Sequence, residues 1–433
     1  MRENKDYLIT EKPSRALLIF SIPMIIGNLF QQAYTIVDSA IVGRYVGETA
    51  LAAVGASYAL TSIFICIAIG GGIGASVIIS HHFGGHNYGR MKNGIRTALL
   101  SFLFISLILG GIGLIFSQQI MEVLNTPADA IDIAVTYLNI YFLGLPFLFM
   151  YNILSSMFNA LGESRIPLYL LIFSSVLNIF LDLYMVAVLN LGVAGAAYAT
   201  FIAQGISAAE GWLSKTEFSD MSRIALPSIL QQSTVSIGMM LVQSVVNSFG
   251  TQILAGFSAA MRIESLCVVP MSAIGNAMSS YTAQNIGAEK EERISQGYRM
   301  GNFMIIVIAV ILCLFLEIAH KPLIALFLDN AASSQTIVTG ESYLKFIGFF
   351  FCMIGFKMAV DGILRGAGAV RVFTIANLVN LTLRVTIAKF GAPIWGVSMV
   401  WYAVPLGWLA NFLISYGYYR TGKWKEAVSK TVD

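Results

Sequence analysis

The chain has 433 residues, of which 57% are hydrophobic and 11% are charged, with a formal net charge of +3. Soluble globular proteins carry about 25% charged residues, so this composition excludes an ordinary soluble protein. It indicates a membrane protein with many spans, in agreement with a mean hydropathy of +0.76. The four cysteines lie inside apolar runs, without the spacing of a metal site or a disulfide framework.

Twelve apolar stretches are long enough to cross a bilayer, which takes about 20 helical residues. The polar N-terminus leads directly into the first and lacks the cleavage site of a signal peptide, so we expect no segment to be removed. Several stretches exceed the minimum, which predicts tilted or kinked helices. The expected spans are residues 15–42, 49–79, 93–116, 133–160, 166–187, 192–213, 221–247, 252–284, 297–318, 339–365, 371–389 and 393–419.

The positions of lysine and arginine predict the orientation of these spans. If the N-terminus is cytoplasmic, 19 basic residues fall in inner segments and three, Arg44, Lys321 and Lys389, fall in outer ones. Cytoplasmic segments are normally enriched in basic residues. We therefore expect a multi-pass protein of the cytoplasmic (plasma) membrane with both termini in the cytoplasm.

The two halves of the chain resemble each other. SIPMIIGNLFQ around Pro23 resembles ALPSILQQ around Pro227, and NALGESR (159–165) aligns with RGAGAVR (365–371). SHHFGGHNYGRM aligns with AQNIGAEKEERI, and LGVAGAAYA aligns with WGVSMVWYA, all at offsets of 203 to 206 residues. Six spans per half give both halves the same topology, with the substrate path between them. We predict an all-α fold of twelve helices in two six-helix lobes, residues 1–214 and 215–433.

The first half holds lone acids in apolar spans. Asp38, Asp182 and Thr200 are all expected about 9–12 Å below the outer surface, and Asn178 shares a helix face with Asp182. A carboxylate in hydrocarbon is costly and is usually functional. Two carboxylates, an amide and a hydroxyl offer hard oxygen ligands to H+ or Na+. The alternative is that each side chain makes a static hydrogen bond between helices.

Further polar positions lie on the first span. Gln31, Tyr34 and Asp38 form one stripe, which predicts a face lining the substrate cavity, or else polar packing against a neighbour. Pro23 permits a kink fifteen residues before Asp38. It is either a hinge that responds to protonation of Asp38 or a static bend.

The second half lacks this acidic set. The positions equivalent to Asp38, Asn178 and Asp182 are Val242, Arg384 and Ala388. Asp361 is a lone acid in the tenth span, and Lys357 lies four residues earlier on the same face. This spacing favours a structural ion pair, with a second protonation site or a substrate-cavity residue as the alternative. Arg262 and Glu264 lie two residues apart, so each needs another partner.

The remaining motifs do not favour enzymatic chemistry. His81, His82 and His86 are expected in a solvated cytoplasmic loop, with a metal site as the alternative. The run IAIGGGIGAS (67–76) lacks the lysine of a nucleotide-binding loop and is typical of close helix packing. We expect neither an enzyme nor a nucleic-acid-binding protein, and no cofactor besides the coupling ion.

In order along the chain, these motifs resemble the multidrug and toxic compound extrusion (MATE) family. The strings that carry the resemblance are SIPMIIGNLFQQAYTIVDSAIVG with ALAAVG, the FGG and IGA loops, NALGESR with LRGAGAVR, and NIFLD before GVAGAAYAT. The resemblance implies a V-shaped pair of lobes and export of cationic amphiphiles in exchange for H+ or Na+. It carries the family's ion site to Asp38, Asn178, Asp182 and Thr200, with Tyr137 as a further position, and the bending proline to Pro23.

The chain departs from the family at three points. It lacks the carboxylate that some branches carry in the seventh helix, and Asp361 lies in the right helix for their second acid but in another local register. The link after the sixth span is short, and a tight link could restrict movement of the lobes. The sequence thus predicts a monomeric multidrug antiporter for small amphiphilic cations. A flippase for lipid-linked precursors is the alternative, although few spans carry basic residues, and a channel fits a one-sided acidic site less well.

Overall fold

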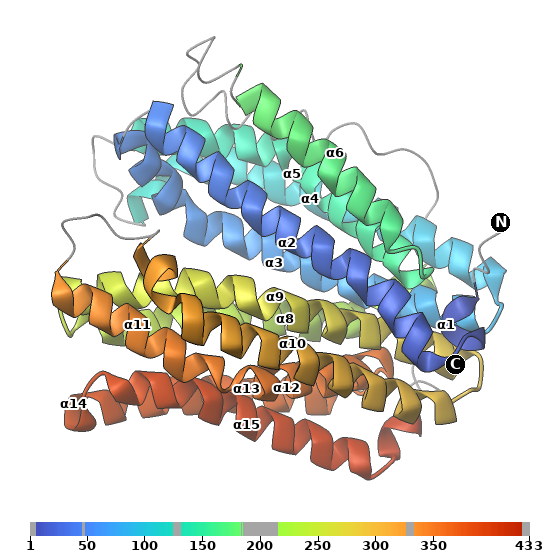
Figure 1. Cartoon of the computed structure of the whole chain (residues 1–433). Coiled ribbons are helices and arrows are strands. Elements are labelled where there is room, and N and C mark those ends of the chain that lie inside the picture. The colour runs from blue at the N-terminus through green and yellow to red at the C-terminus, as the bar shows by residue number, and fades with distance from the viewer. Residues whose placement is uncertain are drawn as a thin grey trace. The chain divides into compact units, whose positions relative to one another are not determined.

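The computed structural model describes residues 6–45, 48–123, 131–182, 184, 215–325 and 333–426, which are almost entirely helical (Figure 1). The first half contains α1 (Tyr7–Thr10), α2 (Pro13–Tyr45), α3 (Glu48–Gly84), α4 (Tyr88–Val123), α5 (Ile131–Ala160) and α6 (Arg165–Asp182). The second half contains α8 (Lys215–Asn247), α9 (Thr251–Gly287), α10 (Glu292–Ala325), α11 (Ser334–Gly348), α12 (Phe351–Gly366), α13 (Val370–Thr386), the π-helix η3 (Ile387–Gly391), α14 (Ala392–Trp395), α15 (Ser398–Arg420) and the short 3-10 helix η4 (Lys423–Glu426).

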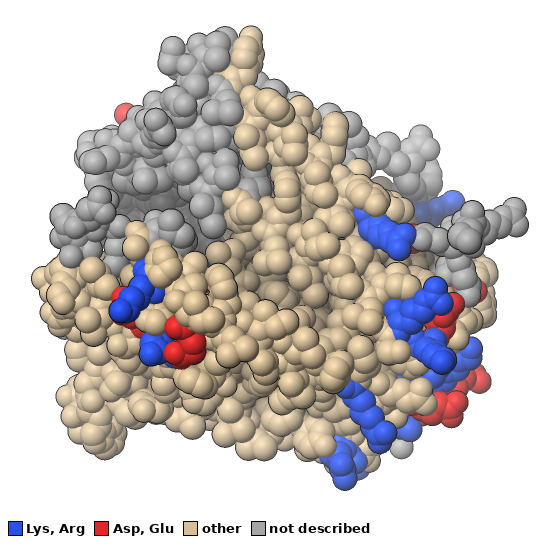
Figure 2. Space-filling model, in the orientation of Figure 1, with Lys and Arg blue, Asp and Glu red and all other residues tan. Residues whose placement is uncertain are grey.

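These helices have the length and composition of membrane spans. In the described part of the chain, nine are long and apolar enough to cross a bilayer, or ten if α11 and α12 are counted as one bent span. Their outer faces carry exposed apolar side chains such as Phe180 (68% exposed) and Ile318 (82% exposed). Such faces are stable in lipid, where each helix also satisfies its own backbone hydrogen bonds. On the face of the C-terminal half in Figure 2, charged side chains gather at the helix ends.

Three expected spans need correction or remain untested. The span predicted at 339–365 is two helices, α11 and α12, which meet at a 53° bend. The helix stops at Gly348 and restarts at Phe351, and the sequence stays apolar across the break, so hydropathy carried no signal for it. His81 and His82 lie in the last turn of α3, which continues into the predicted loop as far as Gly84, whereas His86 lies in the turn after it. The span predicted at 192–213 lies outside the described residues. The short link predicted after it is the first part of a helix, because α8 begins at Lys215.

The internal repeat is confirmed by matching backbone conformations. His86 and Glu289, 203 residues apart, both have positive φ, at 54° and 56°. Gly162 and Gly368, 206 residues apart, have φ of 82° and 69°. The turns also share their hydrogen bonds, since Gly162 N donates to the carbonyl of Asn159 just as Gly368 N donates to that of Arg365. Two stretches of weakly similar sequence therefore end their helices in the same way.

The described chain separates into two compact units. The N-terminal unit comprises residues 26–83 and 87–229, and the C-terminal unit comprises residues 1–25, 84–86 and 230–433. The boundary falls within α2, two residues after Pro23, and again within α8, two residues after Pro227. Each of these helices therefore contributes to both units. The division into lobes 1–214 and 215–433 stays a prediction.

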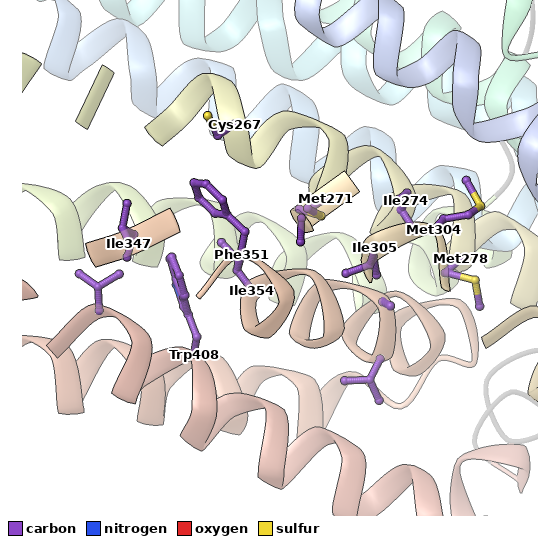
Figure 3. Packing of buried hydrophobic residues seen from close by; sticks show 14 of the residues in the cluster. Cys267, Met271, Ile274, Met278, Met304, Ile305, Ile347, Phe351, Ile354 and Trp408 are labelled. Carbon is purple, nitrogen blue, oxygen red and sulfur yellow. The ribbon is translucent and has the colours of Figure 1, made fainter. Parts of the chain in front are cut away.

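The core of the C-terminal unit is apolar and centred on α9. In Figure 3, Cys267 and Met271 of α9 lie near Phe351 and Ile354 of α12, and Trp408 extends from α15. Helix α9 packs against α10, α11 and α12, and α15 packs against α12 and α13. The α9–α12 crossing is close because it is made by glycines: a methyl group at Gly275 would lie 2.7 Å from the carbonyl oxygen of Met358. Small residues at such crossings are typical of membrane helices.

Candidate ion-coupling site and buried charges

The helices that carry the two predicted acids touch each other in the N-terminal unit. A methyl group at Gly27 of α2 would lie 3.6 Å from Leu168 and 3.7 Å from Leu171 of α6. Both helices run in the same direction, because three alternating spans separate them, and they lie side by side (Figure 1). From this contact, eleven residues lead to Asp38 on α2, and eleven lead from Leu171, or fourteen from Leu168, to Asp182 on α6. These advances rise about 16 Å on α2 and about 16–21 Å on α6, so the two positions lie within about one helical turn of each other in height along neighbouring helices.

The predicted ion-site residues are described to different extents. Asn178 is 1% exposed and lies on α6, one turn before Asp182. Asp38 lies within α2 and Asp182 ends α6, but their side chains are outside the described part of the structure. Thr200 lies outside the described residues altogether. The structure therefore brings the two helices together and leaves the ligand set a prediction.

Tyr137, the further predicted position, lies on α5 of the same unit. Its ring is half-buried and stacks on Tyr141, with ring centroids 6.5 Å apart. The Tyr141 hydroxyl donates to the backbone carbonyl of Thr61 on α3 at 3.3 Å. This aromatic pair thus links α5 to α3.

The residues of the predicted stripe lie on α2. Gln31 is exposed, and its carbonyl accepts a hydrogen bond from Thr35 Oγ1 at 3.0 Å. The side chain of Tyr34 is not described. Pro23 is buried in the half of α2 that belongs to the C-terminal unit.

The C-terminal unit holds a buried ion pair, as the spacing on the tenth span predicted. Lys357 Nζ lies 3.0 Å from Asp361 Oδ2, and both residues are at most 4% exposed. Lys357 also donates to Asn377 Oδ1 at 3.0 Å, and Ser415 Oγ donates to Asp361 Oδ1 at 2.7 Å. This network joins α12, α13 and α15. Asp361 is thus neutralised within the protein, which confirms the structural ion pair that the spacing favoured.

A second buried charged group involves residues that the sequence did not connect. Tyr343 on α11 donates to Glu264 Oε2 on α9 at 2.7 Å. Arg384 on α13 interacts electrostatically with both. Their exposures are 0%, 6% and 7% in the order Tyr343, Glu264, Arg384. The sequence signalled only that Glu264 needed a partner other than Arg262, because the actual partner lies 79 residues away.

Near the end of α12, Arg365 joins the helices of the C-terminal unit. Its Nη2 donates to Asn276 Oδ1 at 2.8 Å and its Nε to Ser279 Oγ at 3.3 Å, both on α9. Its guanidinium lies 6.0 Å from the ring of Phe373. Among the described residues, no group of histidine, cysteine and acidic side chains could hold a metal ion.

Comparison with known proteins identifies the family to which this fold and its internal repeat belong. The sequence model of the MatE family matches twice, at residues 23–184 and 227–389, with starts 204 residues apart. The two matches coincide with the internal repeat, and each begins at a proline, Pro23 or Pro227.

Curated relatives match over nearly the whole length. The chain is 31% identical to "Probable multidrug resistance protein YpnP" of Bacillus subtilis (strain 168), covering 95% of this chain and 96% of that protein. It is 26% identical to "Probable multidrug resistance protein YoeA" of the same organism, covering 100% of both. A solved structure of a multidrug resistance MATE family transporter in an outward-facing conformation superposes with a TM-score of 0.90, at 23% identity, over 98% of this chain and 99% of that one. The fold is therefore that of the MATE transporters, twelve helices in two lobes, as predicted.

Proposed function

Because the chain belongs to the MATE family of multi-pass membrane transporters, we propose that it is a secondary antiporter that exports lipophilic cations in exchange for H+ or Na+. The observation that carries the proposal is the contact between α2 and α6, from which similar advances lead to Asp38 and Asp182. Two acids on adjacent apolar helices are stable when a cation visits them. The names of the two Bacillus subtilis relatives, both probable multidrug resistance proteins, support export of drugs.

In this mechanism the ion binds to oxygens of the N-terminal unit. Asp38, Asp182, Asn178 and Thr200 provide the ligands, with Tyr137 nearby as a weaker candidate. Binding neutralises the acids and biases the protein between inward- and outward-open states, since a ligand shifts an equilibrium by its differential affinity for the two states.

The remaining elements of the proposal follow from α2 and from the family. Gln31 and Tyr34 line the substrate cavity on the helix that carries Asp38, and Pro23 is the hinge of that helix. Asp361 is not required, because Lys357 already neutralises it. The chain acts as a monomer in the cytoplasmic membrane, with both termini in the cytoplasm and no cofactor besides the coupling ion.

The test is transport by the purified chain in lipid vesicles. Uptake of ethidium is measured with an imposed Na+ gradient and, separately, with a pH gradient. We expect one gradient to drive uptake and Asp38→Asn to abolish it. Asp132→Asn is the control, because Asp132 lies in the first turn of α5 and is exposed. If Asp38→Asn transports ethidium like the unsubstituted chain, the coupling mechanism is wrong.

The same vesicles test the alternative of a lipid-precursor flippase. A flippase would translocate a fluorescent lipid diphosphate and would leave ethidium outside. We expect the opposite, because two acids in an apolar site attract cations and repel phosphates.

A further inference from the structure

The group formed by Glu264, Tyr343 and Arg384 has no role in the proposed transport cycle. It joins α9, α11 and α13 deep in the C-terminal unit, and every member is more than nine-tenths buried. The Tyr343 hydroxyl holds the carboxylate of Glu264 at 2.7 Å. Cys267, one turn along α9, also interacts with this carboxylate. A buried acid and a buried base in one group need each other, since an uncompensated charge is strongly destabilising.

Arg384 is incompletely satisfied in this position. Within the described residues, its Nε has no hydrogen-bond partner, and neither has Asn380 Oδ1, one turn earlier on α13. The fold nevertheless makes room for the side chain, because a methyl group at Gly407 of α15 would lie 2.7 Å from Arg384 Cγ. The side chain of Arg384 therefore occupies a space that the glycine leaves open, while its Nε makes no hydrogen bond within the described residues.

The internal repeat makes two members of this group equivalent to residues of the proposed ion site. At the offset of 206 residues, Tyr137 corresponds to Tyr343, and Asn178 corresponds to Arg384. The hydrogen-bonded turns at Gly162 and Gly368 have the same offset and the same conformation, so the correspondence has a structural basis.

The other ion-site positions are occupied by hydrocarbon in the C-terminal unit. Asp182 corresponds to Ala388, and Asp38 corresponds to Val242 at an offset of 204 residues. Ala388 is 0% and Val242 is 1% exposed, and Val404, the counterpart of Thr200, is 1% exposed. The carboxylates and the hydroxyl of the proposed ion site in the N-terminal unit therefore correspond to apolar side chains in the C-terminal unit. The amide of Asn178 corresponds to the guanidinium of Arg384.

We infer that Arg384 is a built-in substitute for the coupling cation: it occupies the C-terminal counterpart of the ion site, neutralises Glu264, and closes that unit to mobile cations. The inference rests on the proposed ion site of the N-terminal unit. A guanidinium stays protonated in proteins, so it can neither leave nor release a proton during the cycle. Each chain then has a single coupling site, and only the N-terminal unit responds to the ion gradient.

Removal of the guanidinium would expose a latent site. Glu264 would keep the Tyr343 hydroxyl, and Asn380 would offer its amide oxygen from α13. Oxygen ligands of this kind suit Na+ or a proton. The buried carboxylate would then require a cation from solution, because its internal one is gone.

The experiment counts ions bound by the purified full-length chain. Binding of radioactive Na+, and protons taken up on acidification, are measured for the unsubstituted chain and for Arg384→Asn. This substitution introduces the amide that Asn178 provides at the equivalent position of the N-terminal unit. We expect Arg384→Asn to bind one more ion per chain and the double variant Arg384→Asn/Glu264→Gln to lose it. Arg384→Lys keeps a fixed positive charge and should show the count of the unsubstituted chain. An unchanged count in folded Arg384→Asn overturns the inference.

A second variant covers the case in which Arg384→Asn does not fold. Arg384→Met/Glu264→Leu replaces both charges by apolar side chains, a change that buried ion pairs often tolerate. We expect it to bind as many ions as the unsubstituted chain. If the folded double variant binds one ion fewer, Glu264 serves a mobile ion and the inference is wrong. The proposed function is judged separately, by whether the unsubstituted chain loses its ion on Asp38→Asn.

Discussion

At the scale of single residues, the glycines of the α9–α12 crossing determine how closely the C-terminal unit packs. A methyl group at Gly362 would collide with the carbonyl oxygen of Gly275. We expect Gly362→Ala to lower the free energy of unfolding by about 1–3 kcal/mol, despite the better helix propensity of alanine.

Gly417 on α15 is the matched control, because a methyl group there would meet nothing within 4 Å. Gly417→Ala should leave the stability unchanged or raise it by up to about 1 kcal/mol. The unfolding temperatures of both variants are measured in the same detergent. Equal changes in unfolding temperature would show that the α9–α12 crossing is less constrained than its geometry indicates.

The pair of Lys357 and Asp361 gives a second test at this scale. Lys357→Met leaves a buried carboxylate without its cation, and such a loss costs about 3–5 kcal/mol. Lys357→Met/Asp361→Leu removes both charges, and Ser415 can then turn fully to Asn411, which already lies 3.4 Å away. We expect unfolding in detergent to show strong destabilisation in the single variant and recovery in the double one. A double variant as unstable as the single one would contradict the ion-pair interpretation.

The sequence could predict those residue contacts that are local. Lys357 and Asp361 are four residues apart on one helix, so their pairing follows from helix geometry. Glu264 and Tyr343 meet only because α9 packs against α11. They are 79 residues apart, so the sequence spacing does not predict that contact. The equivalence of Arg384 to Asn178 was visible in the repeat. Its closeness to Glu264 required the three-dimensional fold.

At the scale of elements, hydropathy predicted the spans well and their interruptions poorly. The break between α11 and α12 consists of Phe349 and Phe350, which are as apolar as the helices beside them. The π-helix η3 likewise continues α13 without a polar residue at its start. Helix ends in lipid are set by tertiary contacts as well as by composition, so they need the fold.

The short helix α1 is held to the C-terminal unit through its carbonyl groups. Asn285 Nδ2 donates to the carbonyl of Leu8 at 3.1 Å, Lys290 Nζ donates to that of Ile9 at 3.0 Å, and Arg293 donates to those of Leu8 and Glu11. The last carbonyls of a helix lack partners within it, and basic side chains satisfy them.

We therefore expect Arg293→Met to release α1. Hydrogen bonds to charged groups contribute about 1.5–3 kcal/mol, so backbone amides of residues 7–11 should exchange with solvent about tenfold faster or more. Arg299→Met is the control, because Arg299 lies exposed on the same helix, α10. Unchanged exchange in Arg293→Met would mean that the burial of Leu8 suffices to hold α1.

At the scale of the whole molecule, two helices contribute to both compact units. Helix α2 passes from the C-terminal to the N-terminal unit after Ile25, and α8 passes in the opposite direction after Ile229. Each passage lies two residues beyond a proline, Pro23 or Pro227. A proline leaves the carbonyl four residues earlier without its helical partner and allows a bend. The two prolines are also equivalent in the repeat, so each unit receives a helix that can bend at the equivalent position.

This arrangement predicts that the prolines matter for transport more than for folding or binding. Pro23→Ala restores the hydrogen bond to the carbonyl of Ile19 and makes α2 harder to bend, so movement between the two units should become harder. We expect ethidium transport in vesicles to fall several-fold, with ion binding and thermal stability close to those of the unsubstituted chain. Pro227→Ala should act in the same direction through α8.

Pro405→Ala is the matched control, because Pro405 lies in α15, which belongs entirely to the C-terminal unit. That substitution also restores a helical hydrogen bond, but within one unit, so transport should be unaffected unless the fold is damaged. A Pro23→Ala variant that still transports at the full rate would show that bending of α2 at Pro23 is not part of the transport cycle. The coupling of Asp38 to the rest of the molecule would then have to pass through the side chains of α6, since α2 and α6 touch at Gly27, four residues after the proline.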